Sequence, residues 1–599
     1  MLDLGVLLRV PCVEAEMGFD ISPDGRHVAF SWNPDGHWEI YEISLSDGSV
    51  PRLVSHGPGA KFHPRYSPDG NSLAFVVDFD GGENFHILLH EFATTHQTDL
   101  TPNITCALQS SFAWSPDGSQ IAFISDQSGR FDVYTMSVTN LETQQILDTG
   151  YPAWKVSWSP DGRWLAVTVE ASGIDYGTYI VPVQGGTPQR IVDEDGPIDA
   201  GQASWSPDSR RLAFSSDTHG YNNIGIYEIA THRITWVTEG EGEKQFPVWS
   251  PDGTRLAYVF NRGTVSWLIV QILGGSSQMY QVEQGVHYIP QFTPHSSHVI
   301  FGFDNPRHPA DLWSLALEDG NFSQLTHSLP EELTEAAFIM PEEVSYPGLD
   351  GIPVPGLLFR PQVQKPGPAV VLIHGGPDWF FEMTWYPFMV HMASRGWVVL
   401  APNYRGSTGY GRIWQEASRF DFGGVDTDDV AAGAYYLQRE GLADPKRIAV
   451  TGRSHGGYLT ASCLTRYPDL WAAGSAFVPF LNWFTNHTEI RPDLQQWDIE
   501  NFGDPVENHD LWLERSPSFF LERIRVPLQL ICGRHDARCP IIDSIQAYAV
   551  LKKMGKEAEL AIYEDEGHAF LKMENILDSE KKRVIFLSRY LEADLPGEN

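Results

Sequence analysis

The stretch Val450–Leu459, VTGRSHGGYL, places one serine, Ser454, among three glycines directly after a short apolar run. This pattern is typical of a nucleophile elbow, in which a strand turns sharply into a helix and raises a hydroxyl above the edge of a sheet. Glycines are needed there because a Cβ would clash. In a chain with 54 glycines the motif also arises by chance as an ordinary turn, so it predicts catalysis only when partner residues accompany it.

Those partners follow in the order typical of an α/β-hydrolase, where an acid and then a histidine lie on loops after later strands. The apolar run LQLICG leads into RHDARCP, which offers Asp536, and AELAIYE leads into DEGHAF, which offers His568. We therefore predict that His568 takes the proton of Ser454 and that Asp536 orients the imidazole.

Three other residues compete for these two roles. His535 directly precedes the candidate acid, Asp565 lies on the histidine loop itself, and Asp543 falls inside a predicted helix. Each is in a less typical position, so the triad Ser454, Asp536 and His568 is preferred.

An acyl-transfer enzyme also needs donors for the developing oxyanion. The turn HGGP follows the predicted strand Ala369–Ile373 and is typical of the oxyanion loop of esterases and lipases. We assign the donors to the backbone N–H groups of Gly376 and of His455, which follows the nucleophile. The alternative is a glycine turn without function.

From residue 336 onward, apolar strands such as AVVLIHG and RIAVTG alternate with amphipathic helical patterns such as VAAGAYYLQRE. Fully apolar strands between such helices predict a mainly parallel sheet covered on both faces. Residues 336–599 are thus predicted to form an α/β-hydrolase domain.

The first half of the chain has a repeating sequence pattern, because SPDG or a similar tetrapeptide recurs every 43 to 48 residues. Each copy lies between two strand-like runs, as in FAWSPDGSQIAFIS, and a further strand pair follows. About four strands in such a period are typical of a propeller blade, whereas an open array of strands is the alternative. The fold class is therefore multidomain: residues 1–13 form an N-terminal segment and residues 14–335 a seven-bladed β-propeller ahead of the hydrolase domain. The last blade contains its own later strands, so we expect the ring to close without a strand from the N-terminus. The seven copies begin at Ser22, Ser67, Ser115, Ser159, Ser206, Ser250 and Thr293.

Composition limits the partners. The 599 residues include 41 Lys and Arg against 77 Asp and Glu, a formal net charge of −36, which argues against nucleic acid or a membrane as a partner. Five scattered cysteines fit reduced thiols better than a disulfide framework. There is no signal-peptide pattern and no apolar run near the roughly 20 residues of a membrane span. We expect a soluble, cytoplasmic protein without a metal or organic cofactor, and leave open whether it forms homo-oligomers.

Five motifs together, following the propeller repeats, resemble those of the prolyl oligopeptidase family of serine peptidases. The resemblance covers nearly the whole chain and points to the acylaminoacyl-peptidase branch, because His374 stands where other branches carry an oxyanion-binding tyrosine. It implies hydrolysis of short peptides, release of an N-acylated first residue, a purely backbone oxyanion hole, and a propeller that screens the active site from folded proteins. The motifs are HGGP (374–377), NYRGSTGYG (403–411), GRSHGG (452–457), HDARCP (535–540) and EGHAF (566–570).

The resemblance also suggests an apolar pocket for the acylated residue. Aromatic side chains in the corresponding segments are candidates to line it, although aromatic residues at such spacing are more often plain core. These candidates are Phe477, Phe480, Trp483, Phe484 and Trp379, with Phe380 and Phe381 beside the last of them.

Two departures from the family pattern stand out. Cys539 replaces the usual valine after the acid loop, and we expect it to be a buried, inert thiol near the site. The short segment before the first repeat leaves little room for the N-terminal helix that ties the two domains together in some relatives.

Several functions remain open. A dipeptidyl peptidase or aminopeptidase would need a carboxylate that captures a free α-amino group, and we identify no such pair in the propeller sequence, where EGEGE (239–243) and the acidic run in IVDEDGP are expected to be solvated turns. Further alternatives are an oligopeptidase without acyl preference, an esterase with incidental peptidase activity, and a binding propeller on an inactive hydrolase fold.

Overall fold

The computed structural model describes residues 1–599 except 17, 47–49, 103–106, 334–337, 362–365 and 593–599. The chain divides into two compact units. One comprises Pro11–Phe79 and Glu83–Pro330, and the other comprises Met1–Val10, Asp80–Gly82 and Glu331–Asn599. The predicted domain boundary between residues 335 and 336 lies outside the described residues. Among the helices in the described ranges, none is long and apolar enough to cross a bilayer.

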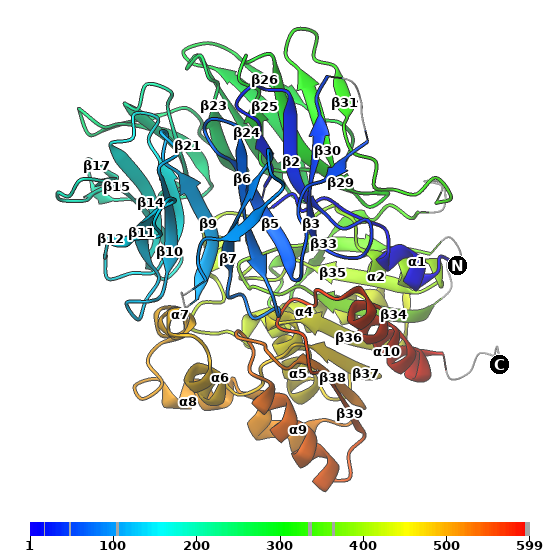
Figure 1. Cartoon of the computed structure of the whole chain (residues 1–599). Helices are drawn as coiled ribbons and strands as arrows, with labels where there is room; N and C mark the ends of the chain where they lie inside the picture. The colour runs from blue at the N-terminus through cyan, green and yellow to red at the C-terminus, as the bar shows by residue number, and fades with distance from the viewer. Residues whose placement is uncertain (17, 47–49, 103–106, 334–337, 362–365, 593–599) are drawn as a thin grey trace. The chain divides into compact units, whose positions relative to one another are not determined.

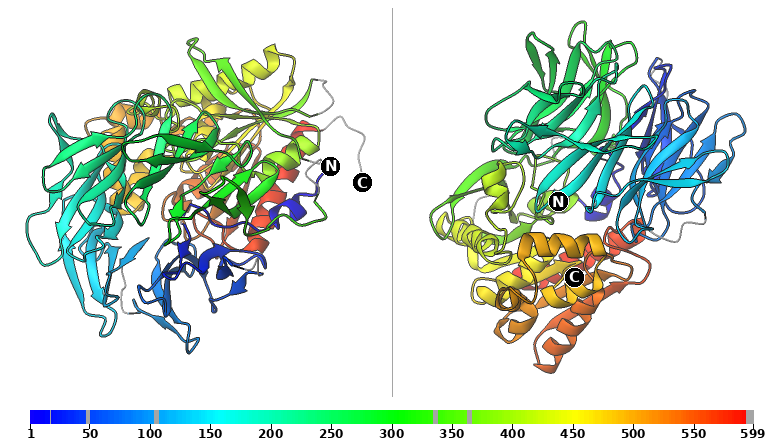
Figure 2. Two further views of the ribbon diagram at one scale, coloured as in Figure 1. Left: turned by 90° about the horizontal axis from the view of Figure 1, so that it is seen from above. Right: turned by 90° about the vertical axis from the view of Figure 1, so that its left-hand side faces the viewer.

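The first unit is a seven-bladed β-propeller, as the repeats predict. Its antiparallel sheets follow one another in chain order, from blue through cyan to green in Figure 2. The small sheet β17–β18 lies between the fourth and fifth blades in the sequence. The strands of the seven blades are β1 (Asp20–Ile21), β2 (His27–Trp32), β3 (Glu39–Ser44) and β4 (Arg52–Leu53); β5 (Ala60–Tyr66), β6 (Ser72–Asp78), β7 (His86–Glu91) and β8 (Gln97–Asp99); β9 (Leu108–Trp114), β10 (Gln120–Ser125), β11 (Asp132–Ser137) and β12 (Thr143–Leu147); β13 (Ala153–Trp158), β14 (Trp164–Ser172), β15 (Asp175–Pro182) and β16 (Gln189–Arg190); β19 (Gly201–Trp205), β20 (Arg211–Ser216), β21 (Asn223–Glu228) and β22 (Arg233–Trp236); β23 (Glu243–Trp249), β24 (Arg255–Arg262), β25 (Val265–Ile272) and β26 (Ser277–Tyr280); and β27 (Val286–His287), β28 (Gln291–Phe292), β29 (His298–Asn305), β30 (His308–Ala316) and β31 (Phe322–Gln324), while β17 is Val192–Asp193 and β18 is Gly196–Pro197.

The recurring SPDG turns share a hydrogen bond between the serine and aspartate side chains and a left-handed backbone conformation at the fourth residue. In the first copy the Ser22 hydroxyl donates to Asp24 Oδ1 at 2.6 Å and accepts the N–H of His27 at 2.9 Å. The serine–aspartate bond recurs in five further copies at 2.6 to 2.7 Å. The fourth turn residue is glycine in five copies, with φ from 70° to 72°, whereas the SPDS and TPHS copies place Ser209 and Ser296 there at φ 60° and 54°. Glycine adopts this conformation without a steric cost, which explains its recurrence.

The first and last blades meet through buried side chains and through the Val13 backbone, whose N–H donates to the Ala310 carbonyl at 2.9 Å and which forms a β-bridge with Trp32. Val28 and Phe30 share a buried cluster with Ile300 and Leu312. Among the described residues, the seventh sheet contains only β27 to β31, as expected from the repeat.

The second unit is built on one eight-stranded sheet in the order β32-β33-β35-β34-β36-β37-β38-β39. The pairs β32–β33 and β33–β35 are antiparallel and all the others are parallel, so the predicted mainly parallel sheet is confirmed. The carboxyl ends of the parallel strands meet at one edge, where α/β proteins place their sites. The strands are β32 (Glu342–Pro347), β33 (Pro353–Phe359), β34 (Gly367–Ile373), β35 (Val398–Pro402), β36 (Ala443–Arg453), β37 (Ala473–Phe477), β38 (Leu528–Gly533) and β39 (Ala558–Tyr563).

Helices cover both faces of this sheet (Figure 1). α2 and α10 lie on one face, and α4, α5 and α9 lie on the other. α1, a helix of five residues, packs on α2 and α10 of the same unit. The helices are α1 (Leu4–Leu8), α2 (Pro387–Ser394), α3 (Arg412–Glu416), α4 (Val425–Arg439), α5 (His455–Arg466), α6 (Trp483–Glu489), α7 (Pro492–Phe502), α8 (His509–Glu514), η2 (Pro517–Arg523), α9 (Ile541–Lys553) and α10 (Met573–Leu591).

Candidate active site

Ser454 occupies the sharp turn between β36 and α5. Its backbone has φ 58° and ψ −123°, a region that a residue with a side chain adopts at a cost of roughly 1–3 kcal/mol. The turn needs its glycines, because a Cβ on Gly456 would lie 2.3 Å from the carbonyl oxygen of Ile373 and one on Gly452 would lie 2.4 Å from that of Gly456. Sequence and structure therefore agree on an elbow.

The structure brings the three predicted triad residues together. His568 Nε2 lies 3.0 Å from Ser454 Oγ, and His568 Nδ1 lies 2.9 Å from each carboxylate oxygen of Asp536. Asp536 Oδ1 also accepts the backbone N–H groups of Arg538 and Cys539 at 2.9 and 2.8 Å. The Asp536 side chain is only 1% exposed, so these donors replace the water it has lost. A carboxylate that accepts from Nδ1–H leaves Nε2 as the acceptor for the serine hydroxyl.

The competing carboxylates are engaged elsewhere. Asp565 pairs with Lys572 on the surface of the histidine loop. Asp543 accepts the successive backbone N–H groups of Leu481 and Asn482, each at 2.9 Å, and burial raises its pKa to about 6. Asp543 therefore holds the loop before α6.

Glu566 is a positioning residue that the sequence did not reveal. It is buried on the loop that carries His568, and its carboxylate accepts the backbone N–H groups of Leu571 at 2.8 Å and Lys572 at 3.0 Å. Its carbonyl accepts the N–H of His535, the competing histidine, at 2.9 Å. A glutamate that binds backbone amides follows no spacing rule, so no sequence pattern marks it.

The loop of the predicted oxyanion donor Gly376 begins directly against the elbow. A Cβ on Gly375 would lie 3.2 Å from that of Ser454, and Gly376 has φ 117°, which requires glycine. The preceding residue, His374, is buried: its Nε2 lies 2.8 Å from Ser407 Oγ, and its Nδ1 lies 2.7 Å from the Gly375 carbonyl oxygen. Burial lowers the pKa of His374 to about 3, so its imidazole is neutral.

The second predicted donor is the backbone N–H of His455. As the first residue of α5, it lies in the turn whose N–H groups have no acceptor within the helix. The positive end of the helix macrodipole faces the same place.

The five candidate pocket residues divide by exposure. Phe477, Phe480 and Trp483 are 3%, 6% and 1% exposed and belong to packed clusters, so they offer little surface to a ligand. Trp379 is 36% exposed and Phe484 is partly buried. Only the latter two keep substantial surface for a substrate.

Cys539 lies beside the predicted nucleophile, with Sγ 3.9 Å from Ser454 Oγ. The thiol is buried, and this burial raises its pKa well above the ordinary value. It is therefore a protonated, weakly nucleophilic thiol at neutral pH. Within the described residues, no three His, Cys, Asp or Glu side chains gather closely enough to hold a metal ion.

Two families of known proteins match parts of this chain. Residues 383–594 match the model of the prolyl oligopeptidase family, and residues 17–151 match that of the TolB beta propeller domain. The first match contains Ser454, Asp536 and His568.

Individual relatives match this chain over part or most of its length. The uncharacterized peptidase YuxL of Bacillus subtilis is 29% identical over 91% of this chain and 85% of its own length. The acylamino-acid-releasing enzyme of Rattus norvegicus is also 29% identical, but over 42% of this chain and 35% of its own length. A puromycin-hydrolyzing peptidase of Mycobacterium tuberculosis shares the fold with a TM-score of 0.87, at 20% identity over 98% of this chain and 96% of its own.

Proposed function

Because this chain belongs to the prolyl oligopeptidase family of serine peptidases, we propose that it hydrolyses short peptides through an acyl-enzyme on Ser454 and releases N-acylated apolar residues. The observation that carries the proposal is the continuous contact from Ser454 Oγ through His568 to the Asp536 carboxylate.

Acylation begins at the serine hydroxyl. His568 Nε2 accepts its proton as Oγ attacks the scissile carbonyl, and Asp536 stabilises the imidazolium that forms. The carbonyl oxygen becomes an oxyanion, which the N–H groups of Gly376 and His455 stabilise. The intermediate collapses when the C–N bond breaks, and the amine leaves with the proton from His568. Water then attacks the acyl carbon as His568 takes one of its protons. The bond between the acyl carbon and Oγ breaks, His568 returns the proton to Oγ, and the N-acylated residue leaves as the acid.

The preference for an acylated residue rests on two observations. A match of 258 residues, at 29% identity, joins this chain to an acylamino-acid-releasing enzyme, and His374, neutral and buried, stands at the position that precedes the oxyanion loop. An acylated first residue carries no ammonium group, so its recognition needs apolar surface and no carboxylate clamp. We assign contact with that residue to Trp379 and Phe484.

The test is the hydrolysis of N-acetyl-phenylalanine p-nitroanilide and of phenylalanine p-nitroanilide by wild type and by Ser454→Ala. We expect the acetylated substrate to be preferred and the variant to be inactive. Preference for the free amine would assign the enzyme to the aminopeptidases or dipeptidyl peptidases. Turnover of N-acetyl-phenylalanine p-nitrophenyl ester without any turnover of the matching anilide would make it an esterase.

A further inference from the structure

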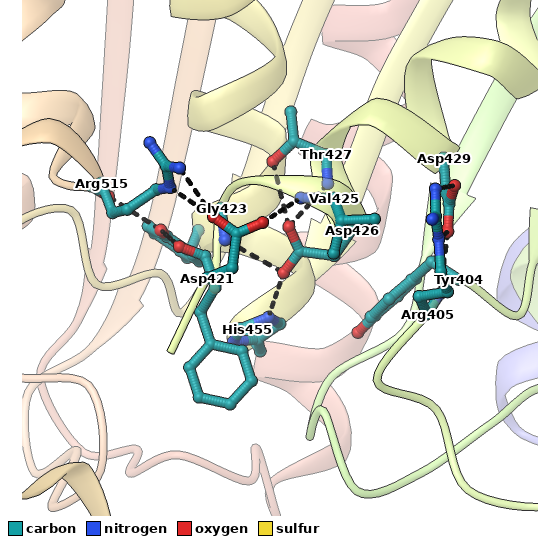
Figure 3. Close-up of polar contacts among 12 residues, drawn as sticks. Tyr404, Arg405, Asp421, Gly423, Val425, Asp426, Thr427, Asp429, His455 and Arg515 are labelled. Carbon is teal, nitrogen blue, oxygen red and sulfur yellow. Dashed lines mark hydrogen bonds and ion pairs between the residues drawn. The ribbon is translucent and has the colours of Figure 1, made fainter. Parts of the chain in front are cut away.

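The imidazole of His455 faces a buried carboxylate at the start of α4. Its Nε2 lies 3.4 Å from Asp426 Oδ2, and the two side chains are 3% and 0% exposed (Figure 3). Asp426 is otherwise satisfied by backbone donors: Oδ2 accepts the N–H of Gly423 at 3.0 Å, and Oδ1 accepts that of Thr427 at 2.6 Å. The carboxylate lies in the first turn of α4, where the helix dipole favours a negative charge; Oδ1 also accepts the Thr427 hydroxyl at 3.5 Å, and Oδ2 faces His455.

This contact acts on the residue that follows the nucleophile. Residues 456 and 457 are glycines, so His455 carries the first side chain after Ser454 that can anchor the strained turn. The His455 amide is one of the two donors assigned to the oxyanion. Whatever holds the imidazole thus also sets the direction of that N–H.

Aromatic rings pack around His455 and connect it to His374, which precedes the loop of the other predicted oxyanion donor, Gly376. Tyr404 stacks on His455 with 6.3 Å between ring centroids and on His374 with 4.2 Å. The Tyr404 hydroxyl donates to the His374 carbonyl at 3.1 Å. Phe422 and Tyr458 enclose His455 on its other sides, with centroids at 5.5 and 5.3 Å. The rings restrict the imidazole laterally, and Asp426 restricts it at its polar tip.

We propose that Asp426 and His455 form a positioning pair that holds the backbone N–H of His455 in the oxyanion hole. The pair acts through the backbone, since neither side chain needs to touch substrate. The inference rests on the proposed acyl transfer at Ser454, and its experiment separates the two.

The first test compares His455→Leu with His455→Gln. Leucine fills a similar volume but removes the donor to Asp426, whereas the glutamine amide places an N–H near the position of Nε2. With N-acetyl-phenylalanine p-nitroanilide, we expect His455→Leu to lower kcat roughly tenfold and to leave KM within twofold, because an oxyanion contact acts in the transition state. His455→Gln should recover most of this loss.

A second test uses two ligands. N-acetyl-phenylalaninal forms a hemiacetal with Ser454 whose oxyanion occupies the hole, and N-acetyl-phenylalanine does not. The inhibition constant of the aldehyde should rise in His455→Leu by the same factor as kcat falls, while that of the acid stays unchanged. Equal weakening of both ligands would contradict the proposal.

Asp426→Asn tests the carboxylate member of the pair, and a second imidazole–carboxylate contact in this chain serves as a control. His487 and Asp498 form another imidazole–carboxylate contact, at 3.1 Å between α6 and α7, with side chains 16% and 4% exposed. Thermal unfolding gives the folded fraction of each variant. Per folded molecule, Asp426→Asn should reduce kcat roughly tenfold and Asp498→Asn less than twofold.

Equal effects of the two asparagine variants, or an unchanged kcat in His455→Leu, would overturn the proposal. If His455→Leu fails to fold, the asparagine pair decides. Ser454→Ala in the same assay separates the proposed function from the positioning pair. Residual activity of Ser454→Ala refutes acyl transfer at Ser454. If Ser454→Ala is inactive and Asp426→Asn is fully active, only the positioning pair is refuted.

Discussion

Arg453, the residue before Ser454, connects the elbow to the loop of His568, the proposed catalytic base. Its Nη2 donates to the backbone carbonyl of His568, and its guanidinium lies 5.3 Å from the ring centroid of Phe477. A single side chain thus joins the end of β36 to the loop that carries His568. We predict that Arg453→Met, which keeps the aliphatic stem and removes the donor, loosens this loop and lowers kcat/KM.

The size of the effect follows from the contact. A hydrogen bond from a charged group contributes about 1.5–3 kcal/mol, and the exposure of Arg453 favours the lower end. A loss of about 1.4 kcal/mol in the transition state corresponds to a tenfold decrease in kcat/KM. The assay is steady-state hydrolysis of N-acetyl-phenylalanine p-nitroanilide, and Arg453→Lys should retain part of the activity because lysine still donates.

Arg534 provides the matched control. It is another exposed arginine near the site, bound to Glu564 through bonds of 2.8 and 2.7 Å. Arg534→Met should leave kcat/KM within about twofold. If Arg453→Met is equally harmless, or if both variants lose the same activity, the tether does not position the base.

Three further predictions address single side chains of the site. Asp536→Asn should lower kcat by roughly 10⁴ at pH 7.5 in the anilide assay, because an amide favours the wrong tautomer of His568; a decrease under tenfold would remove Asp536 from the triad. Cys539→Val should keep kcat/KM within about threefold, and iodoacetamide at pH 7.5 should spare the wild type, because burial raises the pKa of the thiol; rapid inactivation that valine abolishes would contradict this. For His374, the folded pKa of about 3 lies below the ordinary 6.5, so the unfolded chain binds the extra proton between these values and stability falls as the pH drops below 6.5. At pH 5 this costs about 2 kcal/mol, so urea unfolding should show the stability advantage of wild type over His374→Gln decreasing by about that amount from pH 7.5 to pH 5.0; an unchanged difference would refute it.

Local rules explain why so much of the site was predictable. The glycines around Ser454 are required by steric contacts within one turn, and the chain order of acid and histidine follows from the order of the strands. The structure accordingly brings Asp536 and His568 to Ser454 at hydrogen-bonding distances.

The contacts that support the triad could not be predicted in the same way. Asp426 lies 29 residues from His455, and an aspartate in the first turn of a helix is already explained by the helix dipole. Arg453 meets the His568 carbonyl across 115 residues. Spacing also could not separate core from pocket among the aromatic candidates, since Trp483 and Phe484 are adjacent in sequence yet differ in burial.

The composition of the seventh blade has an evolutionary consequence. In the described part of the propeller, each of the seven blades draws its strands from one continuous stretch of chain. One repeat of the gene therefore encodes one complete blade. Duplication or deletion of a single repeat would add or remove a whole blade without leaving a neighbour short of a strand, so the size of the ring can change by simple recombination between repeats.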